Sequence, residues 1–142
     1  MKFSALFSLA AVCFAQTPNI LKSCGGPTDT LNVTDVEIYN YPFKAGQTSV
    51  ISTIGDLTQT IVNGTKVIVS VKVGTITLYS TTQDYCSESG ITCPVQPGHL
   101  INNVSQVIPA NIPAGSFNLQ VRIVSPTNAE VSCISGKIQI TK

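Results

Sequence analysis

The 142-residue chain has little of what most enzymes and nucleic-acid-binding proteins need. It contains a single histidine, a single methionine and no tryptophan, and only 11% of its residues are charged. The formal net charge of +1 gives no basic surface for a polyanion, so nucleic acid is not an expected partner. His99 is the one imidazole base, and no Gly-x-Ser-x-Gly motif or paired carboxylates accompany it. We therefore expect a protein that is not an enzyme and that holds no cofactor.

The first fifteen residues have the pattern of a secretory signal peptide. Lys2 supplies a basic start, residues 3–12 form an apolar and small-residue run, and residues 13–15 provide the small side chains of a cleavage site. We expect cleavage after Ala15, which leaves residues 16–142. The apolar run is shorter than the roughly 20 residues of a membrane-spanning helix. The mature chain is therefore expected to be soluble, and either secreted or delivered to the lumen of a vacuole or lysosome.

Four cysteines remain after removal of Cys13 with the signal peptide, and an even number in an oxidising compartment predicts two disulfides. Of the three possible connectivities we favour Cys86 with Cys93, which closes a short loop. Cys24 would then pair with Cys133 and tie the start of the domain to its last strand. A metal site is not expected, because the spacing contains no Cys-x-x-Cys pair and there is only one histidine.

Three sequons also fit passage through the secretory pathway. They predict N-glycosylation at Asn32, Asn63 and Asn103.

Alternation with period two dominates the mature chain and predicts β-strands. It is clearest in two segments, where one apolar row consists of Val67, Val69, Val71 and Val73 and the other of Phe117, Leu119, Val121 and Ile123. Noisier runs lie between turn residues at positions 32–39, 48–56, 75–81, 100–108 and 135–141. The sequence therefore predicts about seven strands.

No segment shows helical spacing over three turns, and β-branched residues dominate the predicted strands. The best fold prediction is an all-β, immunoglobulin-like antiparallel sandwich that forms one domain over residues 16–142. The Cys, Trp, Cys core of antibody domains is excluded, because the chain has no tryptophan.

One loop motif resembles the signature of the ML-domain (lipid-recognition) family. It reads Cys-Ser-Glu-Ser-Gly-Ile-Thr-Cys-Pro-Val-Gln-Pro-Gly over residues 86–98. Residues 43–47, residues 67–74, residues 112–115 and Cys133 follow the order of the same family. The resemblance thus covers nearly the whole mature chain.

Within this family the chain is similar to the fungal phosphatidylglycerol/phosphatidylinositol transfer proteins and to the Niemann-Pick type C sterol-binding protein. The mammalian sterol carrier has an additional short disulfide near the second strand. Residues 39–46 of this chain contain no cysteine, which favours the fungal branch.

The resemblance implies two sheets splayed enough to form an inter-sheet cavity for one lipid. Apolar burial is worth roughly 25 cal/mol per Å2, so a sterol or an acyl chain gains several kcal/mol without a hydrogen bond. The implied function is a monomeric lipid-binding and transfer protein. It would carry one sterol or one phospholipid (phosphatidylglycerol or phosphatidylinositol) between membranes that it contacts transiently, with intracellular sterol transport as one use.

The expected pocket residues are the apolar rows that face inward. They are Val67, Val69, Val71, Val73, Ile76, Leu78, Leu100, Val104, Phe117, Leu119, Val121 and Ile123. A plain aliphatic core would have the same composition, so both interpretations stay open for each residue. Ile76, Leu78 and Leu100 flank the Cys86 to Cys93 loop, where the family has its pocket mouth. Tyr79 and Tyr85 are candidates for that rim or for ordinary surface positions.

A second function class is also open. Secreted immunoglobulin-like sandwiches without a ligand cavity bind proteins or glycans through their loops, and the sequence pattern of the strands would be the same.

Overall fold

The computed structural model describes residues 20–88 and 91–142, and these residues form β-strands almost throughout. The elements are β1 (Lys22–Ser23), β2 (Leu31–Tyr39), β3 (Phe43–Lys44), β4 (Thr48–Leu57), β5 (Lys66–Val73), β6 (Ile76–Asp84), α1 (Tyr85–Glu88), β7 (Gly98–Val107), β8 (Gly115–Val124) and β9 (Glu130–Thr141). The signal peptide expected at residues 1–15 lies outside the described residues. The helix α1 has four residues, and the described part of the chain holds no helix long enough to cross a membrane.

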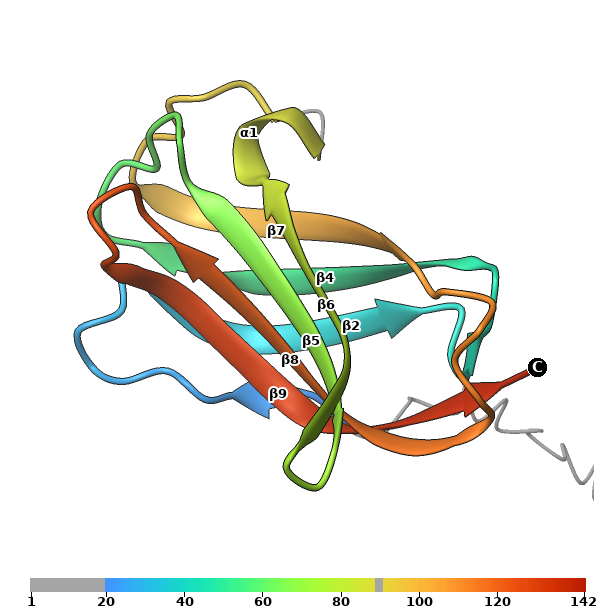
Figure 1. The fold of residues 1–142 in the computed structure, drawn as a ribbon. Helices are drawn as coiled ribbons and strands as arrows, with labels where there is room; N and C mark the ends of the chain where they lie inside the picture. Colours follow the sequence, from blue (N-terminus) through green and yellow to red (C-terminus); the bar gives the residue numbers. More distant parts are fainter. Residues whose placement is uncertain (1–19, 89–90) are drawn as a thin grey trace, which may run out of the picture.

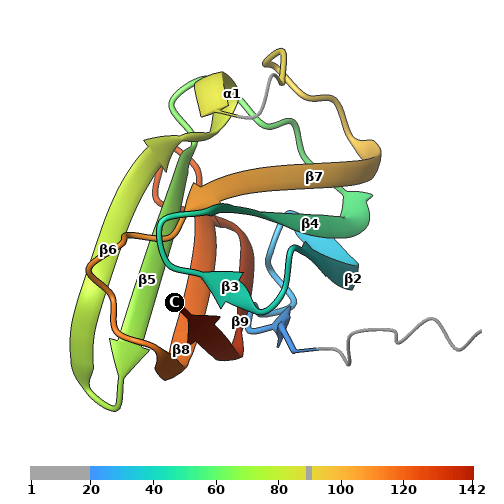
Figure 2. The same cartoon turned by 90° about the vertical axis from the view of Figure 1, so that its right-hand side faces the viewer.

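The strands form two sheets that pack face to face (Figure 1). One sheet has the order β1-β9-β8-β5-β6, and the short β3 adds to β9 in parallel. The other sheet has the order β2-β4-β7. Figure 2 shows the two layers edge-on, with β3 between them at one end. The predicted immunoglobulin-like sandwich is confirmed, and the seven long strands lie where alternation predicted them.

The register of the larger sheet aligns its apolar rows. Val67, Val69 and Val71 of β5 pair with Ile123, Val121 and Leu119 of β8, and all six side chains are buried. Because paired residues point to the same face of a sheet, these two strands give one continuous aliphatic surface toward the other layer. The opposite layer contributes inward residues from β4 and β7, including Ile51 and Val104.

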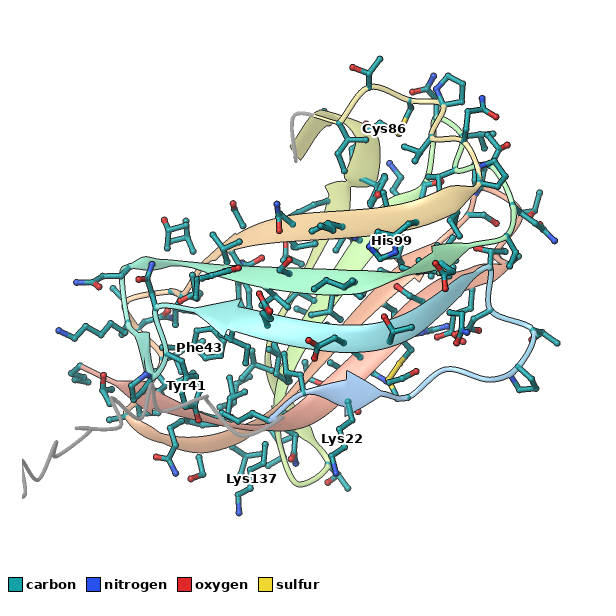
Figure 3. The ribbon with its side chains drawn as sticks, turned by 180° about the vertical axis from the view of Figure 1, so that it is seen from behind. Lys22, Tyr41, Phe43, Cys86, His99 and Lys137 are labelled. Atoms are coloured by element: carbon teal, nitrogen blue, oxygen red, sulfur yellow. A yellow bond between two sulfur atoms is a disulfide. The ribbon has the colours of Figure 1, made fainter. Side chains whose placement is uncertain are left out.

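Two segments from the first third of the chain are attached to β9. The disulfide between Cys24 and Cys133 has a Cα–Cα distance of 5.0 Å, and the Cys24 amide also donates a hydrogen bond to the Cys133 carbonyl at 2.8 Å. At the other end of β9, the Gln139 amide donates to the Tyr41 hydroxyl at 3.0 Å. Tyr41 stacks edge-on against Phe43, which lies buried in the core (Figure 3). These contacts hold β3 across the end of the sandwich.

Candidate functional site

The space between the sheets is the candidate site, and most of the residues expected to line it do face inward. Eight of the twelve are buried: Val67, Val69, Val71, Val104, Phe117, Leu119, Val121 and Ile123. Leu100 is partly buried and packs against the same core. That these nine residues contact a lipid stays a prediction.

The inward placement of Val73, Ile76 and Leu78 is wrong. Their side chains are 44%, 65% and 43% exposed. Val73 and Ile76 flank the turn between β5 and β6, which lies at the end of the larger sheet opposite α1 (Figure 1). Ile76 therefore lies far from the Cys86 to Cys93 loop in space, although it precedes that loop closely in sequence.

For Leu78 the reason for this error is the register between β5 and β6, whereas Val73 and Ile76 pair with each other at the exposed end of the sheet. Val71, Val69 and Val67 pair with Tyr79, Thr81 and Gln83, and a register irregularity follows between Val71 and Lys72.

A shift by one residue reverses the face of every side chain in a strand. The inward row of β6 is therefore Tyr79, Thr81 and Gln83. It is largely polar, so hydrophobic alternation gave no sign of it.

The open space inside the sandwich is small. A void of about 10 Å3 is bounded by β3, the inward faces of β5 to β8 and the connection after β7. It is lined by Phe43, Ile51, Val69, Val71, Tyr79, Gln106, Val107, Ile108, Pro109, Ile112 and Leu119. Such a volume holds about one water molecule, whereas ligand pockets usually measure roughly 300 to 1,000 Å3. The void that the described residues enclose is therefore too small for a lipid, so a lipid bound there would require the two layers to move apart.

The void lies toward the end of the sandwich that β3 closes, away from α1. The loop predicted to form the pocket mouth begins in α1, at the other end of the sandwich. It contains the Cys86 to Cys93 disulfide, with a Cα–Cα distance of 5.7 Å, and Val95 forms an isolated bridge with Ile61. The core beneath this loop is occupied by Tyr85, which is completely buried and not at a rim.

Side chains rather than backbone hydrogen bonds join the sheets along one side. β6 and β7 are edge strands of different sheets. Gln83 Nε2 donates to Gln106 Oε1 at 3.2 Å, and Gln106 Nε2 lies 3.5 Å from the Tyr79 hydroxyl and 2.9 Å from the Val107 carbonyl, to both of which it donates. We call this contact between β6 and β7 the glutamine seam. Because no backbone ladder joins β6 to β7, these two strands can move apart at the seam without breaking backbone hydrogen bonds between them.

Several buried polar atoms near the seam have no partner in the described part of the chain. They are Gln83 Oε1, the Tyr85 hydroxyl, and both Nδ2 and Oδ1 of Asn102. Burial raises the pKa of Tyr85 to about 12, so its hydroxyl stays neutral over the physiological range.

Removing the Tyr85 hydroxyl should not destabilise the protein. We expect Tyr85→Phe to leave the free energy of unfolding unchanged or raise it by about 1 kcal/mol, because a buried hydroxyl without a partner is desolvated at a cost. Urea unfolding measures the change. Tyr39→Phe is the control, since the exposed Tyr39 hydroxyl bonds Glu37 at 2.8 Å. A loss above 1 kcal/mol in Tyr85→Phe alone would show that its hydroxyl does have a partner.

His99 lies on the outer face of the three-stranded sheet and not in the interior (Figure 3). Its Nδ1 is 3.4 Å from Asp56 Oδ1, and both side chains are largely exposed. The pair is the product of strand register, because Asp56 of β4 lies opposite His99 of β7.

Among the described residues, no three His, Cys, Asp or Glu side chains gather in a way that could hold a metal ion.

Comparison with known proteins gives relatives that match most of this chain. A phosphatidylglycerol/phosphatidylinositol transfer protein of Pyricularia oryzae is 32% identical over 127 residues, which are 86% of this chain and 71% of the relative. The Emericella nidulans protein of the same name is 30% identical, covering 84% and 73% of the two chains. A Dictyostelium discoideum protein whose name proposes the same transfer activity is 31% identical and covers 96% of each chain.

Solved structures support the fold. A Niemann-Pick type C2 protein from the Japanese carpenter ant superposes with a TM-score of 0.71 at 12% identity, covering 86% of this chain and 99% of that one. Chicken MD-1, solved in complex with lipid IVa, gives a TM-score of 0.60 at 20% identity, covering 84% and 86%.

The family model for the ML domain matches residues 18–140. That span includes both disulfides and all strands of both sheets except the last residue of β9. The chain is therefore a member of the ML-domain family, a lipid-binding family without catalytic activity.

Proposed function

We propose that this protein carries one sterol or phospholipid between membranes, with the lipid's apolar part held between the two sheets. The observation that carries the proposal is the continuous aliphatic surface of β5 and β8 within an ML-domain sandwich. Each 100 Å2 of lipid surface covered there is worth roughly 2.5 kcal/mol.

Two ligand classes fit this interior. The names of the fungal relatives favour phosphatidylglycerol and phosphatidylinositol. Their acyl chains would lie between the sheets and their charged headgroups would stay in water, because the buried polar residues of the described chain are all uncharged. A sterol is the alternative ligand, and intracellular sterol transport would be the corresponding role.

The lipid would enter through the glutamine seam. The void that the described residues enclose between the sheets measures about 10 Å3, so separation of the edge strands β6 and β7 would make room there for a lipid. The opposite side is held more firmly, since β2 contacts both β1 and β9 there and the Cys24–Cys133 disulfide joins β9 to the segment after β1.

The proposed setting is the secretory pathway, as a secreted or lumenal monomer. All three sequon asparagines are exposed. Asn32 and Asn103 lie on the outer face of the three-stranded sheet, where Asn103 borders an open depression of about 540 Å3 that also includes Tyr39 and Ile101. Glycans at these positions would cover exposed apolar side chains on the face that is not used for the lipid.

A vesicle assay tests the proposal. Donor vesicles would carry fluorescent phosphatidylglycerol, phosphatidylinositol or a fluorescent sterol, and acceptor vesicles would carry none. If the protein carries lipid between membranes, the transfer rate of at least one of the three lipids should be proportional to protein concentration. No transfer of any of them above the protein-free rate would contradict the proposal.

Weakening the glutamine seam should accelerate this transfer. Gln106→Ala removes the side-chain hydrogen bonds to Gln83 and Tyr79, so we expect the initial rate to rise about two- to fivefold, in line with roughly 0.5 to 1 kcal/mol of lost contact. The control is Gln139→Ala, which removes an exposed bond to Ser116. An unchanged rate in Gln106→Ala would place the opening elsewhere.

A further inference from the structure

Asn102 occupies a position where the fold calls for an apolar residue. It lies on the inward row of β7, between Leu100 and Val104, and its side chain is 0% exposed. Neither Nδ2 nor Oδ1 has a hydrogen-bond partner in the described part of the chain. Because a buried amide without partners is desolvated at a cost, a plain core would place leucine or valine here.

The other polar groups around this side of the core are also uncharged. Thr53 lies opposite Asn102 in the β4–β7 register and is buried, and Gln106 follows on the same face of β7 and lines the internal void. Gln83 adds an unpartnered Oε1 from β6. The inner wall formed by β6 and β7 can therefore hydrogen-bond a neutral group, whereas it offers no countercharge for a phosphate.

We propose that Asn102 is a hydrogen-bonding subsite for a hydroxyl group on the buried part of the lipid. The inference rests on the proposed lipid-carrying function and specifies its ligand. A hydroxyl both donates and accepts, so it can accept from Nδ2 and donate to Oδ1. An ester carbonyl only accepts and would leave Oδ1 unpaired, and a phosphate would lose its hydration without an opposite charge.

Two kinds of lipid supply such a group, the ring hydroxyl of a sterol and a hydroxyl within an acyl chain. In the sterol case the hydroxyl would point into the sandwich and the alkyl tail toward the opening. Two ligand pairs distinguish the sources. Cholesterol is compared with 5-cholestene, which lacks the hydroxyl, and 12-hydroxystearate is compared with stearate.

Equilibrium binding of these four ligands to the full glycosylated protein tests the inference. If a ligand hydroxyl pairs with the Asn102 amide, the hydroxylated member of at least one pair should bind about 5- to 10-fold more tightly than the member without the hydroxyl. A preference in the sterol pair alone assigns the subsite to a sterol, and one in the fatty-acid pair alone assigns it to a hydroxylated chain. Equal affinities within both pairs overturn the subsite.

The variant Asn102→Leu identifies the residue responsible. It should lose the preference for the hydroxylated ligand and should bind the deoxy ligand at least as well as the parent does. Asn118→Leu is the matched control, because Asn118 is an exposed residue of β8 outside any sequon, and it should keep the preference. A preference that survives in Asn102→Leu overturns the assignment to Asn102.

The two proposals fail in different ways. Equal affinities within both pairs, together with transfer in the vesicle assay, remove the subsite and leave the carrier. If none of the four ligands binds and no lipid is transferred, both are overturned. Should Asn102→Leu fail to fold, the ligand pairs measured on the parent protein still decide whether a hydroxyl is recognised.

Discussion

Loss of the Cys24–Cys133 disulfide is expected to bring the protein close to unfolding. The bridge spans 109 residues of sequence, and the chain-entropy model gives about 5 kcal/mol for a loop of that length. Domains of this size have only about 5 to 15 kcal/mol of stability in total. We therefore expect the double variant Cys24→Ala/Cys133→Ala to lose most of its free energy of unfolding in a urea titration.

The second disulfide is the matched control. Cys86 and Cys93 are separated by 7 residues, so the same model gives only about 2 kcal/mol for Cys86→Ala/Cys93→Ala. The ratio between the two losses is the informative quantity, because both variants exchange the same atoms. Equal losses would show that loop length does not decide the stabilisation and that local packing around each bridge does.

Filling the interior at Val69 is expected to abolish lipid uptake. Val69 is 1% exposed and lines the internal void. A phenylalanine there would fill the void of about 10 Å3 and overpack its surroundings, at a cost of about 1 to 3 kcal/mol of stability. We expect Val69→Phe to bind lipid at least tenfold more weakly while keeping a cooperative unfolding transition. Val121→Phe, at the paired position on β8, should behave alike.

The control for this experiment is on the same strand. Val73→Phe changes an exposed residue beside the β5–β6 turn, so its lipid affinity should equal that of the parent. Fluorescent-lipid titration measures all three variants. Parent-like affinity in both Val69→Phe and Val121→Phe would mean that the lipid does not lie against β5 and β8.

The sequence predicts the strands well because each long strand buries one face. Alternation identified β5 and β8, and their inward rows are as predicted except at Val73, which is exposed. The strands β1 and β3 have two residues each and show no such alternation. β1 and β3 are held by their pairing with β9 rather than by any local pattern, and pairing between distant segments cannot be read from a short window of sequence.

The candidate site was predicted less completely, and β6 shows why. Its apolar residues Ile76 and Leu78 are exposed, and the residues that pair with the inward row of β5, Tyr79, Thr81 and Gln83, are largely polar. Hydrophobic pattern alone assigns such a strand to the wrong face, because only the register with β5 fixes the orientation. The burial of Asn102 was missed for a related reason. It lies between Leu100 and Val104 on the predicted inward row, but a search for apolar residues selects only the apolar members of such a row.

The volume of the space between the two sheets could not be predicted from the sequence either. A sandwich with few aromatic residues is compatible with a cavity or with a tight aliphatic core, and the void that the described residues enclose between the sheets measures about 10 Å3. The glutamine seam reconciles this closed state with a carrier, because it is a wall between two edge strands that are not joined by backbone hydrogen bonds.

Native mass spectrometry combined with lipid extraction tests the central claim most directly. The glycosylated protein would be purified from a eukaryotic secretory host and analysed without added ligand. We expect one sterol or phospholipid molecule to be bound per chain. A compact protein that emerges empty, and that takes up neither added sterol nor added phospholipid, would contradict it and favour a sandwich that binds protein or glycan through its loops.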